Sequence, residues 1–272
     1  MRRELTGKRV ILTGASGGIG RATAAALVKA GARVALASRS ADALEQLAAT
    51  LRAAEGDVFA VRADVTRPED RERLVRTAVE RFGGIDLLIN NAGVGSWGHF
   101  ATSTPEIMRQ VMEVNFFGPV ELTRAALPHL TKGNQPAVVN VTSMCGRKGM
   151  PAWPEYSASK FALVGMSEAW RGEFARFDVE VITVVPGLTD SGFQNKWLRT
   201  EGKADLKFEE GMKPEEVAEG IVDAVRHNRT EIVLGREARR LLRFNRYFPR
   251  LTNWLVARKV KSLYEAERRA GG

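Results

Sequence analysis

The sequence has little of the chemistry that builds metal centres and disulfide frameworks. Its 272 residues include one cysteine, Cys145, and three histidines that lie far apart in the chain. One cysteine excludes an intrachain disulfide and a multi-cysteine zinc site, and the scattered histidines show no ligand spacing. We therefore expect no metal site.

Long apolar runs are also absent. No stretch approaches the ~18 consecutive apolar residues that a membrane-spanning helix needs, and no apolar segment of signal-peptide length follows the basic N-terminus. The composition, 44% hydrophobic and 27% charged, is that of an ordinary globular protein rather than a disordered one. We expect a cytoplasmic protein with a sizeable core.

Acidic residues are scarce only near the C-terminus. The net charge is +9, but residues 236–272 hold 11 Lys and Arg against 3 Asp and Glu, which leaves 30 against 29 over residues 1–235. The near-neutral body argues against nucleic-acid binding, and the basic segment indicates a local function. We expect residues 1–235 to form one domain and residues 236–272 a basic amphipathic helical extension.

The extension carries apolar residues at helical spacing among arginines, and Pro249 must kink or split its helix. Such a helix is typical of a segment that contacts an anionic membrane, here peripherally at its inner face. The same pattern also suits a lid over a substrate site or a contact between subunits. These alternatives stay open for the stripe of Leu241, Phe244, Phe248, Leu251 and Leu255.

Short apolar runs alternate with longer helical patterns over the first 235 residues. Runs that are apolar throughout are typical of strands covered on both faces, and their alternation with helices indicates a parallel sheet. The predicted fold class is α/β, a seven-stranded parallel sheet between two helix layers. The expected strands are 10–12, 34–37, 58–61, 87–89, 138–141, 181–185 and 232–234, and the helices are 21–30, 41–55, 68–82, 105–130, 154–177 and 214–226.

A glycine-rich segment, TGASGGIG at residues 13–20, joins the first expected strand to the first expected helix. Glycines allow a tight turn and close approach to a pyrophosphate, and the free N–H groups of a helix N-terminus favour an anion. The spacing departs from G-x-G-x-x-G, and simple strand-to-helix packing is the alternative. The candidate phosphate-binding residues are Gly14, Ser16, Gly17, Gly18, Ile19 and Gly20.

The end of the second expected strand bears on the choice of nucleotide. An acid at this place binds the ribose 2′-hydroxyl, whereas an arginine accepts a 2′-phosphate. The sequence has Ser38 and Arg39 here, with no carboxylate before Asp42. We therefore expect NADP(H) to be preferred over NAD(H).

Tyr156 and Lys160 are four residues apart, which places both on one face of a helix. A nearby ammonium favours the phenolate and lowers the phenol pKa, which suits acid–base catalysis. Ser143 follows the fifth expected strand, at the sheet edge where open α/β sheets bind ligands. The pair alone is weak evidence, and its weight comes from sharing that edge with the glycine-rich segment.

In their order these motifs resemble the short-chain dehydrogenase/reductase family, in its short form. The resemblance covers residues 8 to about 235 and implies a Rossmann-type three-layer fold, a nicotinamide cofactor, and a homodimer or homotetramer. One departure is Gly17, which stands where many NADP-dependent relatives carry a basic residue, so that Arg39 is the main discriminator. The matched positions are residues 13–20, Asp64, Val65, residues 90–93, Asn115, Ser143, Tyr156, Lys160, Pro186 and Gly187.

The resemblance implies a role for each matched residue. Tyr156 would be the general acid in reduction and the base in oxidation, and Lys160 would hold the nicotinamide ribose. Ser143 would orient the substrate oxygen, and Asn115 would hold a water that relays protons. The cofactor contacts would be Asp64 and Val65 at the adenine, Asn91, Ala92 and Gly93 at the ribose, and Pro186, Gly187 and Thr189 at the nicotinamide, with Ser191 as a further hydroxyl.

The segments that form substrate walls in this family are bulky and apolar here. Trp97, Trp153 and Phe193, together with Trp197, are candidates for an apolar cleft. We expect an oxidoreductase that uses NADP(H) to interconvert a carbonyl and an alcohol on a steroid-, retinoid- or lipid-like substrate. The alternatives are a 3-oxoacyl thioester reductase of fatty-acid synthesis and a non-catalytic NADPH-binding sensor.

Overall fold

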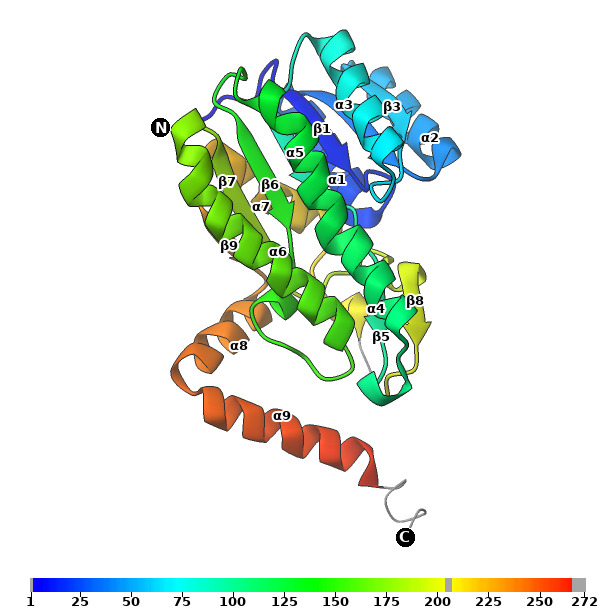
Figure 1. The fold of residues 1–272 in the computed structure, drawn as a ribbon, viewed down its shortest axis with the longest axis vertical. Coiled ribbons are helices and arrows are strands. Elements are labelled where there is room, and N and C mark those ends of the chain that lie inside the picture. Colours follow the sequence, from blue (N-terminus) through cyan, green and yellow to red (C-terminus); the bar gives the residue numbers. More distant parts are fainter. Residues whose placement is uncertain (1, 204–206, 266–272) are drawn as a thin grey trace.

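The structure of the chain, a computed structural model, describes residues 2–203 and 207–265. Its centre is a seven-stranded parallel sheet with the strand order β3-β2-β1-β4-β6-β7-β9 (Figure 1). The expected α/β class and seven-stranded sheet are thereby confirmed. The strands are β1 (Arg9–Thr13), β2 (Arg33–Ser38), β3 (Val58–Arg62), β4 (Leu87–Asn90), β6 (Ala137–Val141), β7 (Glu180–Pro186) and β9 (Glu231–Leu234).

Helices cover both faces of the sheet, which is why its strands are mainly apolar. The buried amides of Asn90 in β4 and Asn140 in β6 are hydrogen-bonded to each other at 2.9 Å. Alternate strand residues face opposite layers: Val10 and Leu12 belong to one core cluster and Ile11 to the other. The first cluster packs against α1 (Gly18–Lys29), α2 (Ala41–Ala53) and α7 (Pro214–Arg226). The second packs against α3 (Pro68–Phe82), α5 (Gly118–Leu130) and α6 (Pro154–Glu173).

The expected continuous helix over residues 105–130 is interrupted. It consists of α4 (Pro105–Met112), a π-helical turn (Glu113–Phe117) and α5. Pro119 lies in the first turn of α5 and has no N–H to donate to the carbonyl of Asn115 four residues earlier. Periodicity alone does not reveal such a turn, because the apolar face continues across it.

The strand order reverses direction at β1, which lies between β2 and β4. From β1 the chain runs outward to β2 and then β3 on one side of the sheet. It then returns to β4, on the other side of β1, and runs outward to β6, β7 and β9. This is the switch point at which open α/β sheets leave a crevice beyond the carboxyl ends of the strands. A separate two-stranded sheet of β5 (Gly95–Trp97) and β8 (Trp197–Thr200) borders the same region.

Two C-terminal helices follow β9, outside the layers of the sheet (Figure 1). Pro249 separates α8 (Arg236–Tyr247) from α9 (Pro249–Leu263), as predicted. Lys148 donates a hydrogen bond to Asn253 of α9, and Tyr264 is hydrogen-bonded to His99, so that α9 spans between the loops beyond β6 and β5. None of the helices in the described part of the chain is both long and apolar enough to cross a membrane.

Candidate active site

The glycine-rich loop between β1 and α1 is shaped by close backbone contacts. Gly14 has a φ of +66°, and a Cβ there would lie 2.8 Å from the Ala92 Cα. A Cβ on Gly20 would lie 2.1 Å from the Gly14 carbonyl oxygen. No side chain caps the N-terminus of α1, so its first N–H groups are left for an anion.

Hydrogen bonds join this loop to the segment that follows β4. The Thr13 hydroxyl accepts from the backbone N–H groups of Asn91 at 3.0 Å and Ala92 at 3.1 Å. The Asn91 amide donates in return to the Thr13 carbonyl at 3.0 Å. These hydrogen bonds therefore hold the carboxyl ends of β1 and β4 together.

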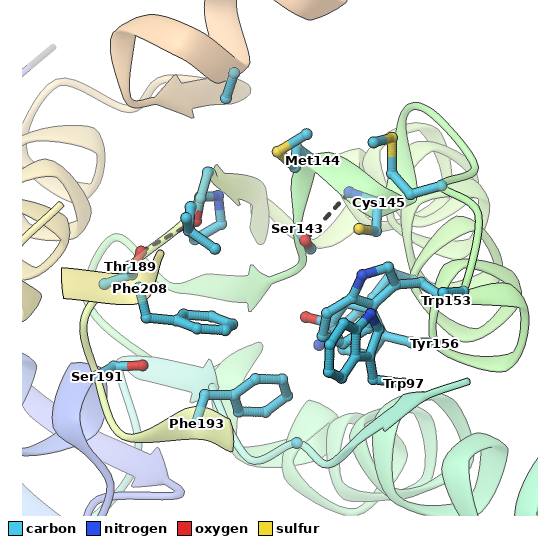
Figure 2. Close-up of a pocket in the computed structure, with 18 of the residues that line it drawn as sticks. Trp97, Ser143, Met144, Cys145, Trp153, Tyr156, Thr189, Ser191, Phe193 and Phe208 are labelled. Carbon is cyan, nitrogen blue, oxygen red and sulfur yellow. Dashed lines mark hydrogen bonds between the residues drawn. The ribbon is translucent and has the colours of Figure 1, made fainter. Parts of the chain in front are cut away.

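Tyr156 of α6 points into the same region as Ser143, which follows β6 (Figure 2). Lys160, also on α6, lines the same cavity. Tyr156 and Lys160 are almost entirely buried, with 8% and 4% of their surface exposed. The Lys160 amine donates to the Val141 carbonyl at 3.1 Å and lies 5.8 Å from the centroid of the Tyr156 ring. Ser143 lies beside the Tyr156 phenol and accepts from the Cys145 N–H at 3.1 Å.

The pKa of Tyr156 differs from the sequence-based expectation in its direction. Burial raises the pKa of the phenol, and the neighbouring Ser143 hydroxyl offsets only part of that increase. Burial also lowers the pKa of Lys160 to about 8. Since the Lys160 amine bonds Val141 rather than the phenol, Tyr156 stays protonated, the form that donates a proton to a carbonyl oxygen.

Asn115 lies in the π-helical turn and is completely buried. Its side chain accepts from the Val94 N–H and donates to the Val94 carbonyl, both at 2.9 Å, and it donates to the Ser159 hydroxyl at 3.0 Å. The side chain therefore joins the segment after β4 to α6, the helix that carries Tyr156 and Lys160.

One cavity of about 580 Å³ extends from the glycine-rich loop to α9. The predicted catalytic and cofactor residues that line it are Gly14, Gly17, Gly18, Ile19, Gly20, Asn91, Gly93, Ser143, Tyr156, Lys160, Pro186, Gly187 and Thr189, together with Ser191. Ser16, Ser38, Arg39, Asp64, Val65, Ala92 and Asn115 are not part of its lining.

The predicted adenine-side residues lie at the ends of β2 and β3. Asp64 accepts hydrogen bonds from the N–H and hydroxyl of Thr66, at 3.0 and 2.8 Å. Val65 is buried beside Gly118 of α5. Arg39, which follows β2, is exposed, and Ser38 donates only a long bond of 3.4 Å to the Ser40 carbonyl.

Aromatic rings form one wall of the cavity (Figure 2). Trp97, Trp153 and Phe193 line it, and the rings of Trp153 and Phe193 lie 5.4 and 5.7 Å from that of Tyr156. Trp197 does not line it, contrary to expectation. Its ring packs behind those of Trp97 and Trp153, at 5.3 and 5.0 Å, as a support for the wall.

The cavity wall continues into residues beyond β8. Phe208 and the inner face of α8 and α9 line it, which agrees with the lid among the alternatives for the C-terminal extension. In the predicted apolar stripe only Leu241 lines the cavity, whereas Phe244, Phe248, Leu251 and Leu255 are exposed. The signal available in the sequence was a second apolar set at helical spacing, namely Val256, Val260 and Leu263, followed by Tyr264.

Comparisons with known proteins agree with this geometry. The family model described as short chain dehydrogenase matches residues 8–202. The chain is 34% identical over 270 residues to the "Uncharacterized oxidoreductase YxnA" of Bacillus subtilis, which covers 98% of this chain and 76% of the relative. It is 40% identical over 207 residues to "11-beta-hydroxysteroid dehydrogenase A" of Arachis hypogaea, covering 75% of this chain and 58% of the relative.

A solved structure shows the same architecture. A short chain dehydrogenase/reductase from Burkholderia phymatum in complex with NAD superimposes with a TM-score of 0.84 at 26% identity, over 92% of this chain and 96% of the other. The family match extends from β1 to β8, so sequence and fold lead to one assignment. The chain belongs to the short-chain dehydrogenase/reductase family and is an oxidoreductase.

Proposed function

We propose that the chain uses NADP(H) to interconvert a carbonyl and an alcohol on a lipophilic substrate. The observation that carries this proposal is the placement of the buried Tyr156 phenol. It lies beside Ser143 and faces a cavity that joins the glycine-rich loop to an aromatic wall. One cavity thus contains an acid–base group, a loop suited to the cofactor and an apolar space for the substrate.

The residues around the cavity fit a dinucleotide. The glycines leave room where a Cβ would meet backbone atoms, and the uncapped N-terminus of α1 suits a pyrophosphate. We assign the predicted adenine, ribose and nicotinamide contacts to the residues at the ends of β3, β4 and β7. When bound, the cofactor supplies or accepts the hydride.

The proton chemistry falls to the chain's own side chains. The Ser143 hydroxyl donates to the substrate oxygen and orients it, and the Tyr156 phenol delivers a proton to that oxygen during reduction. In oxidation the phenolate takes the proton back. Lys160 holds the nicotinamide ribose, and the Asn115 carbonyl, which Pro119 leaves without its α-helical donor, holds the relay water.

The cavity favours a bulky apolar substrate. Its walls are mainly tryptophan, phenylalanine and aliphatic side chains, and α9 adds Val256, Val260 and Leu263. A relative named as a hydroxysteroid dehydrogenase supports a steroid-, retinoid- or lipid-like carbonyl. We expect a cytoplasmic homodimer or homotetramer assembled through α4–α5 and α6.

The outer face of α8 and α9 suits a peripheral contact with an anionic membrane. Tyr247, Phe248 and Trp254 have 68%, 54% and 54% of their surface exposed, and arginines surround them. Apolar rings with neighbouring cations partition into the interface of an anionic bilayer. The inner face of the same helix, α9, lines the cavity. A lipophilic substrate in the membrane would therefore contact the helix that borders its binding site.

The decisive experiment is cofactor oxidation by the purified protein against a carbonyl panel of steroid ketones, retinal, 3-oxoacyl thioesters and small aromatic ketones. We expect turnover with NADPH on the bulky lipophilic carbonyls, and a decrease in kcat of about 10²- to 10⁴-fold in Tyr156→Phe with NADPH binding retained. Selective turnover of the thioesters would favour the fatty-acid reductase instead. Tight NADPH binding without turnover of any carbonyl would favour the sensor.

A further inference from the structure

A lysine from the substrate side of the cavity reaches the glycine-rich loop. Lys196 ends the short 3₁₀ helix Phe193–Lys196, which lies in the loop after β7. A Cβ built on Gly17 would lie 2.7 Å from the Lys196 Nζ atom. The ammonium therefore occupies the space that a side chain at position 17 would take, directly at the N-terminus of α1.

The N-terminus of α1 is an unfavourable place for the Lys196 ammonium unless an anion binds beside it. The N-terminus of a helix carries a partial positive charge, and the Arg39 guanidinium repels the Lys196 ammonium. Partial burial of the amine, with this repulsion as the smaller cause, lowers the pKa of Lys196. Within residues 2–203 and 207–265, no carboxylate lies within ion-pair distance of Lys196 or Arg39.

We propose that Lys196 and Arg39 together bind the 2′-phosphate of NADP(H), with Lys196 supplying from the substrate loop the charge that Gly17 lacks. The inference rests on the cofactor preference proposed above and adds a second residue that determines it. A phosphate between the two cations removes their repulsion and gains a charge-assisted hydrogen bond from each.

The position of Lys196 in the chain links cofactor identity to the substrate wall. The next residue, Trp197, packs against Trp97 and Trp153, and Phe193 three residues earlier contacts the Tyr156 ring. A phosphate that holds Lys196 therefore also holds the loop that carries these rings. NADPH fixes the substrate wall through this contact, whereas NADH has no phosphate at this position and does not.

The test is calorimetric titration of the full chain with NADPH and with NADH, for the wild type and for Lys196→Ala, Lys196→Arg and Arg39→Ala. Lys132→Ala is a matched control, because Lys132 is exposed in the turn before β6, at the opposite edge of the sheet. We expect Lys196→Ala to weaken NADPH binding about tenfold or more and to leave NADH binding within twofold. Lys196→Arg retains most of the NADPH affinity.

Unchanged NADPH affinity in Lys196→Ala would overturn the inference. An equal loss for NADPH and NADH would also overturn it, since the lysine would then contact a group that both cofactors share. Circular dichroism of each variant checks that the fold is retained.

The cofactor preference and the role of Lys196 can fail separately. A wild type that binds NADH as tightly as NADPH contradicts the proposed preference itself. If Arg39→Ala abolishes the preference and Lys196→Ala preserves it, the preference stands and the Lys196 assignment is wrong. Hydrogen exchange of residues 192–200 gives an independent readout: we expect NADPH, but not NADH, to slow it in the wild type and not in Lys196→Ala.

Discussion

Arg199 of β8 joins the two-stranded sheet to the catalytic helix. Its side chain is 4% exposed, and its Nη2 atom donates to the Thr102 hydroxyl at 2.7 Å and to the His99 carbonyl at 2.9 Å. Its Nη1 atom lies 3.9 Å from a carboxylate oxygen of Glu155, the residue directly before Tyr156. Glu155 is 1% exposed and also accepts from the Ser96 hydroxyl at 3.2 Å. Arg199 also pairs with the more exposed Glu201, at 2.7 Å.

Replacing Arg199 by methionine removes the positive partner and leaves the Glu155 carboxylate buried without compensation. Loss of one partner of a buried pair costs about 3–5 kcal/mol in the free energy of unfolding. For a chain of 272 residues this corresponds to a decrease in Tm of about 5–9 °C. Adding Glu155→Gln removes the orphaned charge, so we expect the double variant to be more stable than Arg199→Met alone.

Urea denaturation followed by tryptophan fluorescence and by circular dichroism measures these differences. The exposed pair Arg109–Glu106, also at 3.9 Å, is the matched control, and Arg109→Met should change the stability by less than about 1 kcal/mol. An Arg199→Met variant within 1 kcal/mol of the wild type would refute the reasoning, as would a double variant no more stable than Arg199→Met.

Three further predictions concern the catalytic lysine, the cysteine and the C-terminal helices. The kcat/KM for NADPH should fall above about pH 8, because the Lys160 ammonium is lost there while burial keeps Tyr156 protonated; a profile flat to pH 9.5 would contradict this. Deprotonation of Lys160 relieves the cost of a buried charge, so the Lys160 contribution to stability rises through this range and circular dichroism at pH 9 should show a folded protein. Cys145, with its pKa raised to about 11 by burial, should resist iodoacetamide at pH 8 until denaturant is added, as judged by intact mass. The protein should co-sediment with phosphatidylglycerol vesicles far more than with phosphatidylcholine vesicles, and Trp254→Ser with Leu255→Ser should reduce that binding without changing activity on a water-soluble carbonyl.

Local patterns determined the architecture of the sheet. A strand buried on both faces is apolar at most positions, so its residues indicate it without reference to the rest of the chain. The helices 68–82 and 214–226 agree with α3 and α7 to the residue, because a proline opens each of them and a change of composition closes it. The order of Ser143, Tyr156 and Lys160 in the chain then predicted that all three lie at one edge of the sheet.

Tertiary structure decided what the local patterns left open. The direction of the Tyr156 pKa depends on burial and on the atom that Lys160 bonds, and neither is encoded in a spacing of four residues. The supporting role of Trp197 depends on two other rings behind which it packs.

Contacts between residues far apart in the chain were the least predictable from the sequence. Nothing near Lys196 in the chain indicates that its ammonium lies against Gly17, and nothing in the C-terminal segment indicates which apolar face of α9 turns toward the cavity. Helical periodicity identifies the faces of a helix but not the partner of each face. The sequence by itself thus determined the fold and the family and indicated the residues that we propose for catalysis. Only the packing of distant segments decided which lysine lies at the glycine-rich loop and which helix lines the cavity, because those contacts depend on the fold of the whole chain.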